Sequence, residues 1–137
     1  MADALYPSFK QKLLEGDANA ALNSAEGATG LFAALIDTAD EAYNPADVFY
    51  SDITPAAIVG TDQEILSKTV VGGLLDGSNL TFPSVLGDGT EAVILYRKNA
   101  GANTTWVLVA FLDSGLAVTP NGTDIIITWD AAGIFQL

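Results

Sequence analysis

Residues 104–112 read Thr-Thr-Trp-Val-Leu-Val-Ala-Phe-Leu and carry no charge. Two other segments, Glu91-Ala-Val-Ile-Leu-Tyr96 and Asp124-Ile-Ile-Ile-Thr-Trp129, are also apolar at successive positions. An antiparallel strand with one wet face alternates apolar and polar residues, so strands that are apolar on both faces need cover on both sides. A second sheet, the N-terminal segment or a neighbouring subunit could supply that cover. These three segments predict the centre of a layered β structure.

Shorter strand candidates surround these three, separated by turn signals rich in Gly and Asn. Short strands at fairly even spacing favour a sandwich or barrel, and no helical stretches lie between them to support a βαβ layout. We therefore predict a mainly β fold, an antiparallel β-sandwich of the jelly-roll or a related type. The expected strands are 31–37, 47–51, 57–59, 68–74, 79–85, 91–97, 104–113, 124–129 and 134–137.

The N-terminal segment has the one clear helical pattern. Its apolar side chains fall at or beside helical spacing: Leu5, Tyr6, Phe9, Leu13 and Leu14. Pro7 fits a first helical turn and Gly16 fits a helix end, so the pattern predicts a helix over residues 2–15. We divide the chain into an N-terminal helix or arm with a linker, residues 1–27, and a β-sandwich domain, residues 28–137.

Composition excludes several classes of partner and chemistry. The 137-residue chain has 17 acidic and 5 basic residues, a formal net charge of −12, and neither Cys nor His. We expect no nucleic acid and no membrane among its partners, because both are usually anionic. Thiol and imidazole catalysis are excluded, as are the common zinc, copper and haem sites. No stretch resembles a secretory signal or a membrane span, so we expect synthesis in a cytosol-like compartment.

Carboxylates are the remaining acid–base groups and calcium the metal to consider. Asp37, Asp40 and Glu41 cluster after the first expected strand, and Asp113 with Asp124 is a second candidate pair for calcium. Acidic residues after a strand are more often turn formers. No nucleophile elbow or phosphate-binding loop is present. We therefore assign no catalytic, cofactor-binding or metal-binding residue and expect a protein that is not an enzyme.

Two further patterns concern glycines and aromatic residues. Gly72-Gly73 lies inside the expected strand 68–74, where paired glycines favour a bulge or close backbone packing. Trp106 and Trp129 lie in apolar strands, so core packing is the first expectation for both. Carbohydrate binding stays open as an alternative, with aromatic residues of a more loop-like stretch as its candidates: Tyr43, Phe49 and Tyr50.

A series of short motifs runs along almost the whole chain, in a fixed order. They are Ala4-Leu5-Tyr6, Leu14-Glu15-Gly16, Leu35-Ile36-Asp37-Thr38-Ala39, Ser51-Asp52-Ile53, Lys68-Thr69-Val70, Leu80-Thr81-Phe82, Val118-Thr119-Pro120-Asn121-Gly122, Trp129-Asp130 and Gly133-Ile134-Phe135-Gln136-Leu137. Together with the segment 91–96, this series resembles a family of small virion-associated proteins of tailed bacteriophages. The chain departs from that family at the small residues 23–30. The resemblance carries over no catalytic residue.

The resemblance implies a non-enzymatic structural protein of the phage virion, made in the cytoplasm of the bacterial host. Our first hypothesis is a capsid cement or decoration protein that binds the lattice of the major capsid protein as a homo-oligomer, with a trimer as the starting hypothesis. Its expected interface is the N-terminal apolar set, Leu5, Tyr6, Phe9, Leu13 and Leu14; the alternative is a helix packed permanently on its own domain. Other hypotheses are a tail, baseplate or head–tail completion component, a carbohydrate-binding module for host adsorption and, least favoured, a carboxylate hydrolase.

Overall fold

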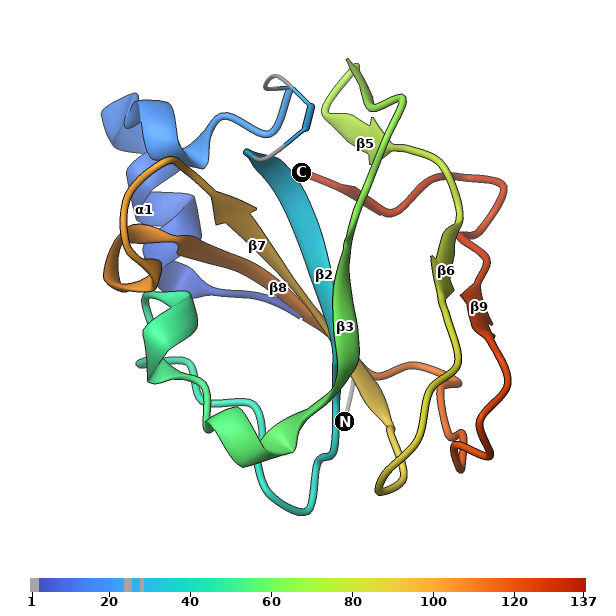
Figure 1. The fold of residues 1–137 in the computed structure, drawn as a ribbon. Helices are drawn as coiled ribbons and strands as arrows, with labels where there is room; N and C mark the ends of the chain where they lie inside the picture. The colour runs from blue at the N-terminus through green and yellow to red at the C-terminus, as the bar shows by residue number, and fades with distance from the viewer. Residues whose placement is uncertain (1–2, 24–25, 28) are drawn as a thin grey trace.

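The computed structural model describes residues 3–23, 26–27 and 29–137, and these form a mainly β, antiparallel fold (Figure 1). The fold class expected from the sequence is therefore confirmed. The strands are β1 (Ala4–Leu5), β2 (Gly30–Ile36), β3 (Ile58–Glu64), β4 (Thr69–Val71), β5 (Leu74–Asp76), β6 (Leu80–Phe82), β7 (Ala92–Lys98), β8 (Val107–Leu112), β9 (Ile125–Ile127) and β10 (Phe135–Gln136). The helical elements are α1 (Pro7–Glu15) and the short 3₁₀ helices η1 (Ala18–Ala20), η2 (Tyr50–Asp52), η3 (Pro55–Ala57) and η4 (Asn103–Thr105).

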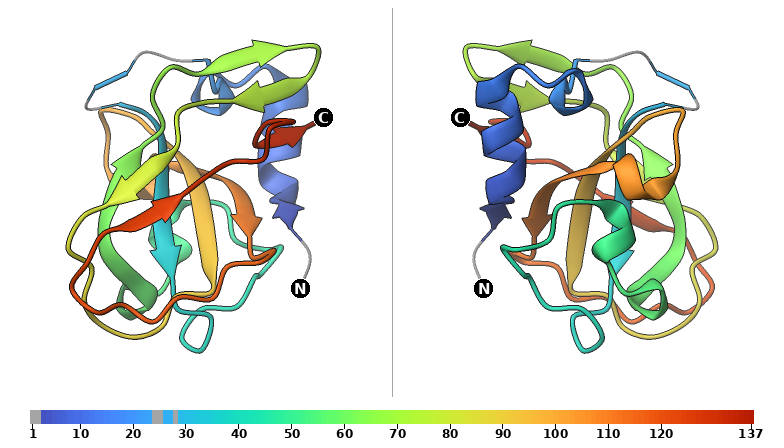
Figure 2. Two further views of the ribbon diagram at one scale, coloured as in Figure 1. Left: turned by 90° about the vertical axis from the view of Figure 1, so that its right-hand side faces the viewer. Right: turned by 90° about the vertical axis from the view of Figure 1, so that its left-hand side faces the viewer.

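The main sheet has five strands in the order β1-β8-β7-β2-β3. Its central strands are apolar on both faces, and successive residues such as Ile94 and Leu95 are both fully buried. One face is covered by the loop after β2, whose Tyr43 and Tyr50 rings contact Phe111 and Tyr96. The other face looks toward two small sheets, β10-β5-β4 and β6-β9 (Figures 1 and 2). The chain itself thus supplies cover for both faces of the central strands.

The N-terminal segment begins as a strand and continues as a helix. The helix prediction is correct from Pro7, at the first helical position, to Glu15, and Gly16 ends it in the left-handed conformation (φ 73°). The prediction is wrong at residues 4–5, which form β1 and pair antiparallel with Phe111 and Ala110 of β8. Edge pairing overrides helical periodicity there; residue 2 lies outside the described residues.

The expected strand 68–74 is a hairpin. Gly72 and Gly73 both have positive φ (62° and 79°) and join β4 to β5, with Val71 paired to Leu74. Two consecutive residues with φ above zero define the tight turn that suits twisted antiparallel strands, and Gly-Gly is one of the pairs that adopt it. The expected bulge is therefore wrong, whereas the alternative of close backbone packing is confirmed at Gly73, where a Cβ atom would lie 3.1 Å from the Leu137 carbonyl oxygen.

The expected strand 47–51 is also wrong. Phe49 makes one isolated bridge to Val107, and the chain then turns into η2. The Asp52 carboxylate accepts hydrogen bonds from the amides of Val48 and Phe49, both at 2.9 Å, and so favours a turn over a longer strand. The short strand expected at 57–59 is instead the start of β3, which runs to Glu64.

Candidate interaction site

The N-terminal apolar set packs mainly on its own domain. Tyr6 and Phe9 are fully buried, Leu5 and Leu13 are half-buried, and Leu14 is 90% exposed. The Phe9 ring meets Phe135 edge-on with centroids 6.5 Å apart. The described residues of the N-terminal segment and of the β domain therefore share one core and are also joined by the β1–β8 pairing. Of the five residues expected at an interface, Leu14 alone is largely open to a partner in this arrangement.

Exposed apolar side chains gather instead on the two small sheets. Among the described residues, seven large apolar side chains are largely exposed. Four of them lie in or beside the sheet β10-β5-β4: Leu66, Val70, Val71 and Leu137. Leu86 follows β6 and Ile126 lies in β9. Most of the exposed large apolar side chains of the described residues therefore lie in or beside the sheet β10-β5-β4.

The outer strand of that sheet, residues Thr69, Val70 and Val71, is here called the β4 edge. All three residues are exposed, and no described strand pairs with β4 on the side away from β5. Sheet edges in monomeric proteins are commonly guarded by a charged side chain, often Lys. Lys68 stands next to the β4 edge but turns inward: its ammonium contacts the Glu26 carboxylate at 3.4 Å, and its side chain is 2% exposed. The β4 edge is thus an unguarded, β-branched strand that can accept a further strand.

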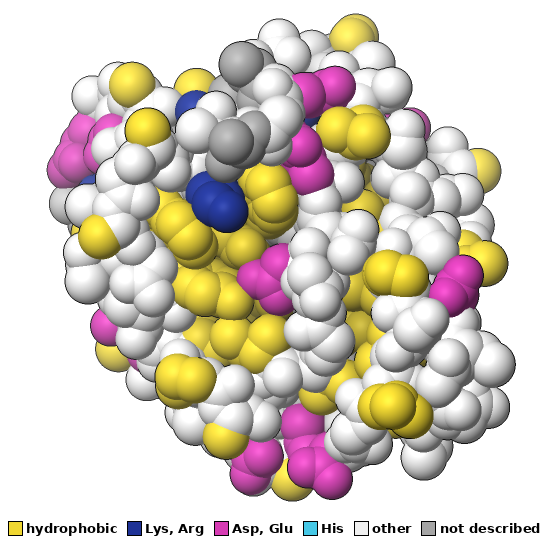
Figure 3. Space-filling view, viewed as in Figure 1, with side chains coloured by type: hydrophobic (Ala, Val, Ile, Leu, Met, Phe, Trp, Pro, Cys, Tyr) yellow, Lys and Arg dark blue, Asp and Glu magenta, His cyan; other side chains and the backbone are white. Residues whose placement is uncertain are grey.

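A cluster of aromatic rings lies on the face of the main sheet that the loop after β2 covers. The hydroxyls of Tyr50 and Tyr96 both donate to Asp62 Oδ2 at 2.7 Å. Trp106 stacks on Tyr96 with centroids 5.8 Å apart. Lys98 Nζ lies 4.8 Å from the centre of the Trp106 ring. Figure 3 shows apolar side chains gathered in a hollow on this face, with acidic and basic groups at its margin.

Burial raises the pKa of Asp62, and the two tyrosine hydroxyls oppose that rise by bonding to the ionised form. The pKa of Asp62 is thus higher in the folded protein than in the unfolded chain. The free energy of unfolding therefore falls as the pH rises from below the unfolded-state pKa to above the folded-state pKa. We compare the unfolding free energy of Asp62→Asn with that of the wild type at about pH 4 and pH 7. We expect the difference to shift in favour of the variant at the higher pH, because the variant has no carboxyl group to ionise. Urea unfolding at both pH values measures this difference.

Glu15→Gln, at an exposed carboxyl, controls for the loss of one negative charge. Tyr50→Phe removes one of the two donors to Asp62 and should raise the pKa of Asp62 further, so its stability should fall more steeply with rising pH. A difference between Asp62→Asn and the wild type that is the same at both pH values, after this control, would contradict the role given to Asp62.

The structure brings together two of the three carboxylates expected to cluster and adds a distant one. One carboxylate oxygen each from Asp37, Asp40 and Asp88 lies within 4.8 Å of the others. Glu41 points elsewhere and accepts the Thr54 amide at 2.8 Å. Asp37 Oδ1 accepts the Ala39 amide at 2.9 Å, as a turn former does. The described residues do not place Asp113 and Asp124 in such a group.

The aromatic residues considered for sugar binding are engaged within the protein. Tyr43, Phe49, Tyr50 and both tryptophans are half-buried and pack against the core. The indole N–H groups of Trp106 and Trp129 donate to the carbonyls of Gly101 and Ser78, both at 3.0 Å.

No protein-family model matches the chain, and no curated protein matches it either. Among the described residues, no helix is long and apolar enough to cross a membrane.

Proposed function

We propose that this chain is a non-enzymatic structural protein of a tailed-phage virion, and more specifically a capsid cement protein that binds the lattice of the major capsid protein. The β4 edge carries the proposal, because it is an exposed β-branched strand without a guarding charge. A strand of this kind suits a protein that works in an assembly, since it binds a neighbouring chain through main-chain hydrogen bonds.

The charge of the protein fits the outside of a particle. Its net charge of −12 gives no attraction to packaged DNA. Weak contacts repeated over a lattice add up through avidity, so each copy needs only a small interface. A homo-oligomer, with three copies as the starting hypothesis, would multiply the contacts made per assembly; light scattering on the purified protein measures the number of copies.

The replacement Val71→Lys places a charge on the β4 edge at a side chain that is 75% exposed. We expect the unfolding free energy to stay within about 0.5 kcal/mol of the wild type. We expect binding to purified shells that lack the protein to weaken at least about tenfold, because a lysine on an edge strand opposes strand addition. Cosedimentation with such shells measures the affinity.

Leu86→Lys is the matched control, because Leu86 is 71% exposed but lies beside β6, away from the β4 edge. Equal binding by both variants and the wild type would remove the β4 edge from the interface. The virion role itself is tested by counting copies in purified virions by quantitative mass spectrometry. Copies comparable in number with the major capsid protein support a shell protein, a few copies point to the tail, baseplate or portal, and absence rejects the proposal.

A further inference from the structure

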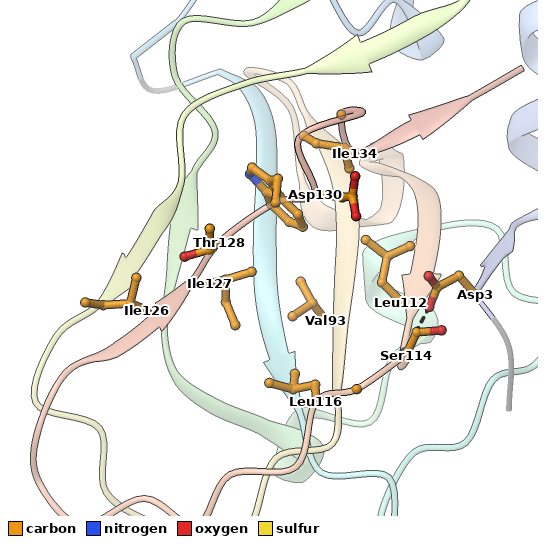
Figure 4. Close-up of a pocket in the computed structure, with 13 residues that line it drawn as sticks. Asp3, Val93, Leu112, Ser114, Leu116, Ile126, Ile127, Thr128, Asp130 and Ile134 are labelled. Carbon is orange, nitrogen blue, oxygen red and sulfur yellow. Dashed lines mark hydrogen bonds between the residues drawn. The ribbon is translucent and has the colours of Figure 1, made fainter.

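A pocket of about 510 Å³ opens between the main sheet and the segment that contains β9 and β10 (Figure 4). Val93 of β7 and Leu112 of β8 line it from the sheet, and Ile127 and Trp129 line it from the C-terminal segment. Its volume lies within the usual range of small-ligand sites, roughly 300–1,000 Å³. The pocket therefore has room for one or two side chains of another molecule.

The polar groups of this pocket include carboxylates but no base. Asp3 and Asp130 line it and are both exposed. One oxygen of Asp3 accepts the amides of Asp113 and Ser114, at 2.9 and 3.0 Å, and one oxygen of Asp130 accepts the Ala132 amide at 2.8 Å. These bonds fix the direction of both carboxylates. Figure 4 shows Asp3 and Asp130 on the side of the pocket nearer Leu112, across from Ile126 and Ile127.

The basic side chains of the protein lie elsewhere. None of its 5 basic residues lines the pocket. Lys12 and Lys68 pair with Asp17 and Glu26. Lys98 lies over two aromatic rings, and Arg97 donates to the Ala21 carbonyl at 3.0 Å. Among the residues that the structure describes, no basic side chain lines the pocket to neutralise Asp3 and Asp130.

We propose that this pocket receives an extended segment of a partner protein in which an apolar side chain stands next to Lys or Arg. The apolar side chain fills the space between Val93 and Ile127, where it is removed from water. The neighbouring cation lies against Asp3 and Asp130, and its aliphatic stem covers Leu112. A second copy of this chain fits less well, because four of its 5 basic residues are engaged within the fold.

The test uses the isolated protein and two short peptides, acetyl-Lys-Ile-Lys-amide and acetyl-Glu-Ile-Glu-amide. The protein has two tryptophans, and their indole N–H signals are followed by NMR; a Trp106→Phe variant assigns them. We expect the basic peptide to shift the Trp129 signal with saturation in the millimolar range, since a short flexible peptide gives up much contact energy on ordering. The acidic peptide should leave the signal unchanged.

Asp3→Asn with Asp130→Asn removes both charges, while each amide oxygen can still accept the backbone bonds. Binding of the basic peptide should weaken about five- to tenfold in this double variant, the scale of two exposed ion pairs. Asp40→Asn with Asp88→Asn removes the same charge at exposed positions outside the pocket and should change binding less than about twofold. No saturable shift of Trp129 up to about 10 mM peptide, or equal shifts with both peptides, would overturn the proposal. Neither result depends on whether the protein belongs to a virion.

Discussion

Replacing Phe9 with alanine should lower the free energy of unfolding by about 3–5 kcal/mol, the range for deleting a buried aromatic side chain. Phe9 is fully buried and meets Phe135 edge-on, so its removal leaves a cavity between α1 and the C-terminal strand. Urea unfolding followed by tryptophan fluorescence measures the change. The same reasoning means that deletion of residues 1–16 removes β1 and two buried aromatic rings, and should destabilise the whole domain.

Leu14→Ala is the control within the same helix. Leu14 is 90% exposed, so its truncation should change the unfolding free energy by less than about 0.5 kcal/mol. If Phe9→Ala proved as mild as Leu14→Ala, the N-terminal segment would be a detachable arm. That result would support the hypothesis that the N-terminal segment docks on the shell as an arm. It would also weaken the assignment of docking to the β4 edge.

The second large effect is expected from Gly133→Ala, about 2–4 kcal/mol of lost stability. Gly133 has φ 105°, and a Cβ atom there would lie 2.8 Å from Leu74 Cδ1 and 3.0 Å from the Leu75 carbonyl oxygen. The alanine is thus strained in its backbone and crowded against β5. Because Gly133 also lines the pocket, the variant should bind the basic peptide more weakly as well.

Gly87→Ala separates these two causes. Gly87 has φ 120°, close to that of Gly133, but no other atom lies within 4 Å of a Cβ built there. It should therefore show the backbone strain alone and be milder than Gly133→Ala by about 1–3 kcal/mol, the usual range for overpacking. Equal losses in the two variants would mean that the C-terminal segment is not held closely against β5.

Sequence reasoning succeeded where a structure follows from neighbouring residues. The expected strand 91–97 is within one residue of β7, because its continuous apolar run can be satisfied only between two layers. The end of α1 was found from Gly16, whose left-handed conformation suits glycine. The hairpin turn at Gly72 and Gly73 was also within reach, since Gly-Gly between apolar residues is a known hairpin signal.

Sequence reasoning failed where a structure depends on distant partners. β1 exists because residues 4–5 meet β8, more than a hundred residues along the chain. Helical spacing identified the apolar side chains of the N-terminal segment, but spacing does not tell whether Phe9 packs on Phe135 or on another protein. The carboxylate of Asp62 between two tyrosines, and Asp88 beside Asp37, are likewise products of tertiary folding. The β4 edge could not be predicted, because it depends on the hairpin between β4 and β5 and on the contact of Lys68 with Glu26, which draws the lysine inward.

The contact between Phe9 and Phe135 also bears on how the protein is made. During translation the N-terminal segment leaves the ribosome first, at a chain growth of about 5–20 residues per second. On the order of ten seconds then pass before β10, which packs against these apolar side chains, has been synthesised. A nascent chain that stops before residue 135 leaves Phe9 without this partner. The packing around Phe9 is completed only after residue 135 has been translated. We therefore expect incomplete chains to be degraded more readily by cellular proteases.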